Sequence, residues 1–282
     1  MTMFRRTRIA LIVTLAAILA APAAVAHAGS AFAGRPGAVS DFSGDGFADV
    51  LGIDAAGRLL YYPNNGLRLT GPSQIGDGWS RFRHVKAGDW SGDGFADVLG
   101  IDTDGYLFYY PHNGNRLDGP IPFGHFSRAT RHLAVADWSG DGHADLLVAD
   151  ATNGDLYYFP NQNNQAPTGT GQRIGAGFAS LQHMVAADWS GDGFADVIGS
   201  DSSGNLWYYP HQGSGLGARQ QIGSGGWQNF RFIRAMDFSG DGFADVLGVD
   251  SGGSLWYYPH QGSGLGARQS LGSGWGGFLN IL

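Results

Sequence analysis

Asp89-Trp90-Ser91-Gly92-Asp93-Gly94-Phe95-Ala96-Asp97 is one of five copies of a nine-residue stretch in a chain of 282 residues. Every copy has Asp at positions 1, 5 and 9, Ser at position 3 and Gly at positions 4 and 6. Similarity at a nearly fixed spacing indicates a fold built from repeated units, here of about 49 residues across residues 38–282. The copies begin at Asp41, Asp89, Asp137, Asp188 and Asp237.

Each repeat contains four short segments with strand character. In the second repeat, an apolar run over Phe82–Trp90 leads into the loop, and a second apolar run covers Asp97–Asp102. An Asp-x-x-Gly turn then precedes the aromatic segment Tyr106–Tyr110, and a Gly-rich connection leads to a last short segment, near Ile75 in the first repeat. Four such strands per repeat predict an all-β fold, a five-bladed β-propeller of four-stranded blades.

The two ends of the repeat region predict a closed ring. The C-terminal stretch Trp275–Leu282 has the register of Trp79–Lys86, so it ends where a sixth loop would begin. We expect its last strand to pair beside Ala38–Ser40 and complete the first blade, because a ring leaves no blade face uncovered. An open or dimerising array of the same blades is the alternative; for a closed ring we expect a monomer.

The nine-residue loop has the oxygen pattern of a calcium site. Calcium takes six to eight oxygen ligands, and alternate side-chain oxygens with Gly at the bend can wrap one ion. An EF-hand is excluded, because position 12 is never Glu and a strand follows the loop. The alternative is a turn whose carboxylates accept backbone N–H groups. We expect one weak calcium site per blade, five in all, with side chains of positions 1, 3, 5 and 9 and the position 7 carbonyl as ligands: Asp41, Ser43, Asp45, Phe47, Asp49; Asp89, Ser91, Asp93, Phe95, Asp97; Asp137, Ser139, Asp141, His143, Asp145; Asp188, Ser190, Asp192, Phe194, Asp196; Asp237, Ser239, Asp241, Phe243 and Asp245.

These loops, with the Asp-x-x-Gly-x-Leu-x-x-Tyr-Pro pattern over Asp54–Pro63, resemble the FG-GAP/VCBS repeat family across about 245 residues. That family includes the calcium-bearing blades of integrin α-subunits, and the resemblance implies that the loop joins the first and second strands of each blade. Ser at position 3 and the absence of a Gly-Ala-Pro element depart from the family pattern. Gly-Trp-x-x-Phe elements, such as Gly226–Phe230, are also similar to five-bladed tachylectin-type lectins.

The N-terminus has the composition of a secretory signal peptide. Three Arg residues precede the apolar run Ile9–Ala21, and small residues suit cleavage near Ala26 or Ala28. We therefore expect a signal peptide over 1–28, a linker over 29–37 and a secreted, extracellular protein with no membrane span. The formal charge of -7, with one Lys and no basic stripe, argues against nucleic acid as a partner. The chain has no Cys, which excludes disulfides and thiolate metal sites.

A second set of residues suggests a ligand site, with structural roles as the alternative. The polar residue after each aromatic run and Pro falls at an equivalent rim position in a ring, where it either caps a turn or lines a repeated pocket. The aromatic runs either pack between blades or line such a pocket. The candidate ligand-binding residues are Asn64, His112, Asn161, His211, His260, Trp207 and Trp256.

The sequence favours recognition over catalysis. It has no Gly-x-Ser-x-Gly, no His-Glu-x-x-His, no Cys and no Glu, so common hydrolase machinery is missing and we expect no enzyme activity. An exported, repetitive protein with aromatic and polar rims suits a module that binds glycans or cell-surface polymers. An integrin-like protein-adhesion module is the first alternative, and a secreted hydrolase with a cryptic site is the second.

Overall fold

The structure is a computed structural model that describes residues 39–66, 68–126 and 129–282. Contacts divide the chain into two units, residues 1–31 and 32–282, and only the second contains described residues. The expected signal peptide over 1–28 and linker over 29–37 therefore lie outside the described residues.

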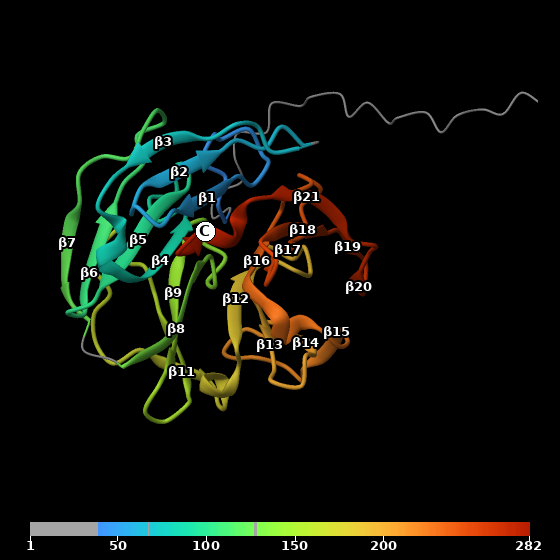
Figure 1. The fold of residues 1–282 in the computed structure, drawn as a ribbon. Helices are drawn as coiled ribbons and strands as arrows, with labels where there is room; N and C mark the ends of the chain where they lie inside the picture. Colours follow the sequence, from blue (N-terminus) through green and yellow to red (C-terminus); the bar gives the residue numbers. More distant parts are fainter. Residues whose placement is uncertain (1–38, 67, 127–128) are drawn as a thin grey trace, which may run out of the picture. The chain divides into compact units, whose positions relative to one another are not determined.

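The described residues form five four-stranded antiparallel sheets arranged as the blades of a ring, as predicted (Figure 1). Blade 1 combines the two ends of the repeat region, and blades 2 to 5 each follow chain order outward from the middle. The strands of blades 1 to 3 are β22 (Asn280–Ile281), β1 (Val50–Ile53), β2 (Leu59–Tyr62) and β3 (Ser73–Gly76); β4 (Phe82–Gly88), β5 (Asp97–Asp102), β6 (Tyr106–Tyr110) and β7 (Ile121–His125); and β8 (Thr130–Ala136), β9 (Asp145–Asp150), β10 (Leu156–Phe159) and β11 (Gln172–Gly175). Those of blades 4 and 5 are β12 (His183–Ala187), β13 (Asp196–Ser200), β14 (Leu206–Tyr209) and β15 (Gln220–Gly223); and β16 (Phe230–Met236), β17 (Asp245–Asp250), β18 (Ser254–Tyr258) and β21 (Gln269–Ser273).

The remaining regular elements of the described chain are short. A two-stranded ribbon, β19 (His260–Gln261) with β20 (Gly264–Leu265), projects from blade 5. Four single-turn 3₁₀ segments carry the Gly-Trp and Gly-Phe elements that lead toward an innermost strand. They are η1 (Trp79–Arg81), η2 (Phe178–Ser180), η3 (Trp227–Asn229) and η4 (Trp275–Gly277).

The C-terminal strand closes the ring. β22 pairs antiparallel with β1, with Ile281 opposite Gly52, and so supplies the innermost strand of blade 1. The prediction that the C-terminus completes the first blade is confirmed, although the paired strand is β1 and Val39 and Ser40 lie in no strand. Because both ends of the repeat region share one sheet, blade 1 cannot form until the chain has come full circle.

The core lies between blades, because each sheet is apolar on both faces. In β5, residues Val98, Leu99 and Ile101 have no exposed surface, and one buried cluster joins Val98 of blade 2 to Leu51 of blade 1. Five such clusters cover the five blade junctions of the described chain. Gly100 in β5 makes room for the aromatic residue that enters the blade, since a Cβ there would lie 2.7 Å from the Phe82 ring.

Polar side chains of the innermost strands also bridge the junctions, in a series that we call the inner-strand ring. His132 Nε2 lies 2.9 Å from the Leu181 carbonyl oxygen, and His183 Nε2 lies 3.3 Å from that of Arg231. Asn280 donates to the Val85 carbonyl oxygen at 3.3 Å, which links blade 1 to blade 2. His84 bonds the Thr130 backbone, and Arg231 and Arg234 bond residues near the end of the chain. The members of the inner-strand ring are His84, His132, His183, Arg231, Arg234 and Asn280.

Candidate functional site

The five Asp/Gly loops lie where the family resemblance implied, between the first and second strands of each blade. In blade 2 the loop leaves β4 after Gly88 and enters β5 at Asp97. Blade 1 differs, because its innermost strand comes from the C-terminus and its loop is entered from Ser40. Ser40 has φ 68°, in the left-handed region that L-residues rarely adopt.

The position 1 carboxylate is held by backbone N–H groups of its own loop. Asp89 Oδ1 accepts from Gly92 at 2.7 Å, and its Oδ2 accepts from Gly94 at 2.9 Å. The Gly at position 6 makes the same bond in all five loops, at 2.8–2.9 Å. Burial raises the pKa of Asp41, Asp137 and Asp188, and raises that of Asp237 to about 6.

The position 9 carboxylate connects the loop to the aromatic strand and the residue beyond it. Asp97 Oδ2 accepts from the Ser91 backbone at 2.9 Å and from the Tyr109 hydroxyl at 3.2 Å, while Oδ1 accepts from the His112 backbone at 2.6 Å. Burial, with a smaller contribution from Asp89 and Asp93, raises the pKa of Asp97 to about 7. In the other loops the position 9 carboxyl has a pKa of about 7 in Asp49 and Asp145, and of about 6 in Asp196 and Asp245.

Positions 7 and 8 link each loop to the loop of the preceding blade. The Ala96 backbone donates to the Asp41 carbonyl oxygen at 2.7 Å, and a Cβ on Gly44 would lie 2.5 Å from the Phe95 ring. Both contacts recur at every junction, including the closing one between blades 5 and 1. In each of the five bonds, at 2.7–2.9 Å, the N–H of the position 8 Ala donates to the carbonyl oxygen of a position 1 Asp. The pairs are Ala48 with Asp237, Ala96 with Asp41, Ala144 with Asp89, Ala195 with Asp137 and Ala244 with Asp188. We call this closed circuit the loop ring.

The rim residues predicted to cap turns or line pockets lie beneath the loops. The turn-capping alternative is confirmed, since the side chain accepts a backbone N–H two or three residues further along the chain in Asn64, His112, Asn161 and His211. Asn161 donates to the carbonyl oxygens of Ala144 in its own loop and Trp90 in the preceding loop, at 3.2 and 2.7 Å. His211 packs edge-on against Trp138 of the preceding loop and stacks on Phe194 of its own. Asn64 bridges two loops through its side-chain amide, as Asn161 does. His260 packs against Trp189 and Phe243, as His211 does against its two rings, and His112 contacts Phe42 and Phe95. The set Asn64, His112 and Asn161 is at most 5% exposed, so these three side chains face packed protein.

Trp207 and Trp256 lie elsewhere, on the outer half of blades 4 and 5. Trp207 Nε1–H donates to Asp201 Oδ2 at 2.7 Å, and the Arg219 guanidinium lies 4.0 Å from the Trp207 ring centroid. The indole N–H is the main reason that the pKa of Asp201 falls to about 2, so this carboxylate is ionised at neutral pH. We call these three residues the Trp–Arg–Asp unit.

Blade 5 repeats the unit with nearly the same dimensions. Trp256 Nε1–H donates to Asp250 at 2.8 Å, and Arg268 lies 4.1 Å from the Trp256 centroid. The equivalent position holds Leu60, Phe108 and Tyr157 in the other blades, so two blades carry the unit. Sequence reasoning found the two Trp residues and missed both Arg residues, although each lies inside the identical stretches that begin at the two Trp residues.

Comparison with known proteins shows which family the chain belongs to. The model of the FG-GAP-like repeat matches residues 41–100, 89–148, 137–199 and 188–248, each match spanning two loops. The chain belongs to the FG-GAP-like repeat family. No protein of curated function matches it.

Two solved structures resemble this FG-GAP-like propeller at low identity. An Agrocybe aegerita lectin, described as recognising non-reducing terminal N-acetylglucosamine, has a TM-score of 0.47 and 22% identity over 83% of this chain. A structure of BBS1N in complex with ARL6DN, soaked with lead, has a TM-score of 0.42 and 9% identity over 84% of this chain. The chain spans 65% and 68% of those two chains. At these identities, neither similarity says what the present propeller binds.

The FG-GAP-like loops have the ligand chemistry of calcium sites but not the arrangement. Three carboxylates and a hydroxyl occur in each loop, and Ser43 Oγ lies 3.4 Å from Asp41 Oδ1. However, the carboxylates of positions 1, 5 and 9 point to backbone N–H groups, and over the described residues no group of three acidic or His side chains is arranged to hold a metal ion. Calcium binding stays a prediction.

The described part of this propeller contains no helix with the length and apolar character needed to span a bilayer.

Proposed function

We propose that this propeller is an exported, non-catalytic recognition module for glycans or cell-surface polymers. The observation that carries the proposal is the Trp–Arg–Asp unit, present in the same geometry on two blades. Each Trp is partly exposed at the surface of its blade. Export rests on the signal-peptide pattern of residues 1–28, which the described residues do not include.

The unit combines two kinds of contact that a sugar uses. The indole offers an apolar face for the C–H groups of a pyranose ring. The Asp201 carboxylate, which accepts N–H groups of Ser203, Asn205 and Trp207, holds the indole in place. The Arg219 guanidinium makes no hydrogen bond or ion pair with another described residue, so its N–H donors are available to sugar oxygens. These groups come from one strand, one turn and one connection of the same blade.

Two equivalent units make the module bivalent. Each unit presents a small surface, so a single contact is expected to be weak. Simultaneous binding of both units to one polymer raises the apparent affinity by the effective concentration of the second unit. The proposal therefore favours a repetitive polymer over a free monosaccharide.

A glycan array and a cell-wall polysaccharide pull-down test the proposal, in calcium and in EDTA. We expect wild-type protein to bind polysaccharide, the double variant Trp207→Ala/Trp256→Ala to lose binding, and either single variant to lose most of the avidity. Tyr106→Ala is the matched control, because Tyr106 is an aromatic residue 48% exposed on blade 2. Retention of polysaccharide by the double variant would sink the proposal. Capture of one protein partner without any glycan would favour adhesion instead, and turnover of the polymer would favour a hydrolase.

A further inference from the structure

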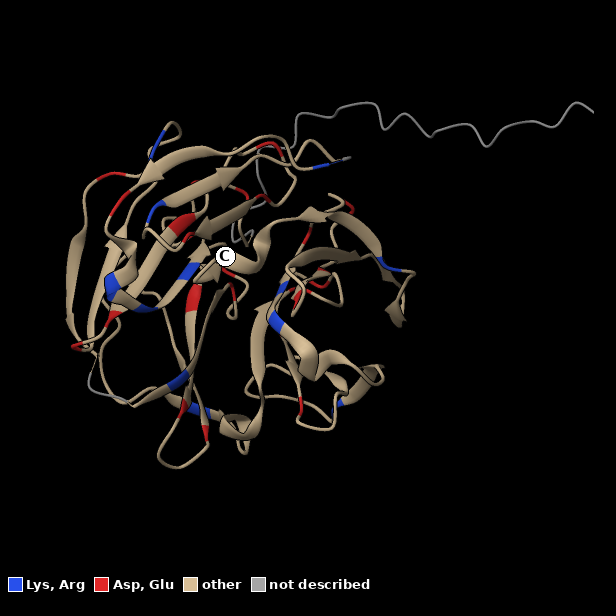
Figure 2. Ribbon diagram, viewed as in Figure 1, with Lys and Arg blue, Asp and Glu red and all other residues tan. Residues whose placement is uncertain are grey.

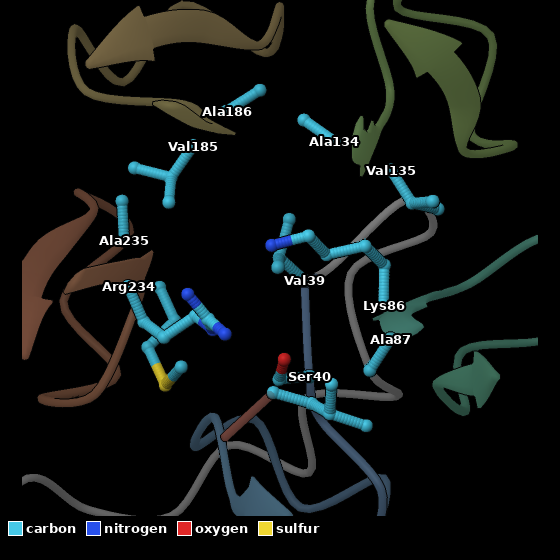
Figure 3. Close-up of a pocket in the computed structure, with 12 residues that line it drawn as sticks. Val39, Ser40, Lys86, Ala87, Ala134, Val135, Val185, Ala186, Arg234 and Ala235 are labelled. Carbon is cyan, nitrogen blue, oxygen red and sulfur yellow. The ribbon is translucent and has the colours of Figure 1, made fainter. Parts of the chain in front are cut away.

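The middle of the ring contains a space lined by the innermost strands. It holds about 330 Å³ free of protein atoms, including the part that opens to solvent. Ten of its twelve lining residues have uncharged side chains, most of them Val and Ala, and the other two are Lys86 of β4 and Arg234 of β16. Figure 3 shows these two side chains extending toward the middle of the space from opposite sides, and Figure 2 shows basic segments on both strands.

Lys86 is a cation without a counter-ion. It is the single Lys of the chain, and it makes no hydrogen bond or ion pair with another described residue. Burial, with repulsion from Arg234, holds the pKa of its ammonium well below the usual value. Part of its surface nevertheless stays open to the central space. An unpaired ammonium at such depth costs free energy unless a partner reaches it.

Arg234 is held in place without being neutralised. Its guanidinium donates to the Ile233 carbonyl oxygen at 2.6 Å, to Asn280 Oδ1 at 2.5 Å and to the Ile281 carbonyl oxygen. All of these acceptors are uncharged, and burial lowers the pKa of Arg234 to about 10. These bonds fix the guanidinium at the wall of the space, as a preformed half of an anion site.

Ser40 adds a third polar group. Its backbone adopts φ 68°, and its hydroxyl makes no hydrogen bond with another described residue. Figure 3 shows the Ser40 oxygen among the side chains around the space. A non-Gly residue held in the left-handed region is strained, and such strain is often retained at binding sites. Ser40 can therefore donate to a ligand that lies between the two cations.

We propose that the central space binds a small inorganic oxyanion, of the phosphate or sulfate class, between Lys86 and Arg234. An oxyanion supplies the negative charge that the lining lacks and has enough oxygens for an ammonium, a guanidinium and a hydroxyl together. The mostly apolar lining has three polar side chains, too few for the several hydroxyl groups of a sugar ring. This site is separate from the Trp–Arg–Asp units, and neither proposal depends on the other.

The other charged and titratable groups that face Lys86 also lack negative charge. Lys86 contributes to lowering the pKa of His84, His132 and His183, and Arg131 contributes to lowering that of all three. A bound anion shields these groups from Lys86 and favours the protonated ammonium. Anion binding should therefore raise the pKa of the Lys86 ammonium, with proton uptake at pH values where the unbound amine is partly neutral.

Thermal unfolding of EDTA-treated protein tests the site, with sodium sulfate compared with sodium chloride at equal ionic strength. The variants are Lys86→Met, which keeps the length of the side chain and removes its charge, and the control Arg116→Met, whose Arg is 78% exposed at the side chain. We expect sulfate to raise the unfolding midpoint of wild type and Arg116→Met by several degrees more than that of Lys86→Met. In chloride, Lys86→Met should unfold at a higher temperature than wild type, because a buried amine without a hydrogen-bond partner is replaced by an apolar side chain.

Calorimetric titration with sulfate or inorganic phosphate gives an independent readout. In two buffers of different ionisation enthalpy, wild type should take up protons on binding and Lys86→Met should show no saturable binding. An equal sulfate shift in wild type and Lys86→Met would place any anion elsewhere and overturn the proposal. Absence of saturable binding to wild type by both anions would overturn it too.

Discussion

Two circuits join the five blades, at opposite ends of the innermost strands, and they are built on different principles. The loop ring uses the backbone bond from position 8 to position 1 and the packing of position 7 on Gly at position 4, identically at all five junctions. The inner-strand ring uses polar side chains that vary: a His at three junctions, an Arg pair at one and an Asn at one, namely His84, His132, His183, Arg231 with Arg234, and Asn280. A repeated backbone contact needs only the repeated loop, whereas side-chain bridges are free to vary from blade to blade.

The two rings also respond to protons in opposite ways. Burial keeps the loop carboxylates from ionising and so raises their pKa, but it keeps the histidines from becoming protonated and so lowers theirs. The loop ring therefore loses stability as its carboxylates ionise, and the inner-strand ring loses stability as its histidines become protonated. This difference makes the two rings separable by mutation and by pH.

The largest expected effect comes from removing one carboxylate of the loop ring. Asp97→Ala leaves the N–H groups of Ser91 and His112 and the Tyr109 hydroxyl without their acceptor in a buried site. We expect a loss of about 3–5 kcal/mol in the free energy of unfolding, measured by chemical denaturation. Asp93→Ala is the matched control, since Asp93 accepts only the exposed Phe95 N–H, and it should cost about 1 kcal/mol or less. Equal losses in the two variants would contradict the hydrogen-bonded loop.

The pH dependence of the metal-free protein is the next largest effect. Asp49, Asp97 and Asp145 have a folded pKa of about 7 against 3.8, so the folded state binds more protons between these values. The stability that they contribute is full below pH 4 and is lost as pH rises toward 7. His84 and His132 have a folded pKa of about 4 against 6.5, so their contribution falls as pH decreases from 6.5 toward 4.

Because the raised carboxylates outnumber the lowered histidines, the carboxylates should dominate the balance. In EDTA, the free energy of unfolding should fall as pH rises from 4.5 to 7, at about 1.4 kcal/mol per pH unit for each responsible group before compensation. Denaturant midpoints at intervals of pH measure this slope. A rise across the whole interval would mean that the inner-strand ring controls the pH response.

Calcium gives a further way to distinguish the loop ring from the inner-strand ring, because its expected ligands all lie in the loop ring. At ten times its dissociation constant, one ion stabilises the folded state by about 1.4 kcal/mol. We therefore expect a higher melting temperature in millimolar calcium than in EDTA, with the gain largest near pH 7, where unbound carboxylates are least stable. Asp93→Ala should keep the EDTA melting temperature and lose part of the calcium gain, because position 5 has little structural role. Identical melting curves in calcium and EDTA would leave the loops as metal-free turns.

The sequence predicted what lies within one repeat better than what lies between repeats. The loop, the strand order and the aromatic strand follow from local patterns, and the match of Trp275–Leu282 to Trp79–Lys86 predicted closure. The contact of Phe95 with Gly44 joins residues one repeat apart, and no pattern inside a repeat reveals it. Asn161 was expected to cap a turn or line a pocket, and its Oδ1 does cap a turn by accepting from the Asn164 N–H at 2.9 Å; its amide nitrogen also reaches the preceding loop, which the sequence did not predict. Lys86 is the single Lys of the chain, so no repeated pattern predicted a charged group in the central space.

The smallest effect at neutral pH, and the one that isolates the inner-strand ring, comes from His132→Phe. Blade 5 has Phe232 at the equivalent position of its innermost strand, so an aromatic ring is compatible with this site. At pH 7.5 the variant should lose about 1 kcal/mol, because the Leu181 carbonyl oxygen loses its partner at 2.9 Å. At pH 5 the order should reverse. Wild type keeps His132 neutral against an unfolded pKa of 6.5, which costs it about 2 kcal/mol that the variant does not bear. Denaturation at both pH values, with His125→Phe on the exposed strand β7 as control, should show a crossover for His132→Phe alone. If wild type stays the more stable protein at pH 5, the inner-strand histidines are not held neutral by burial and the contrast between the two rings is wrong.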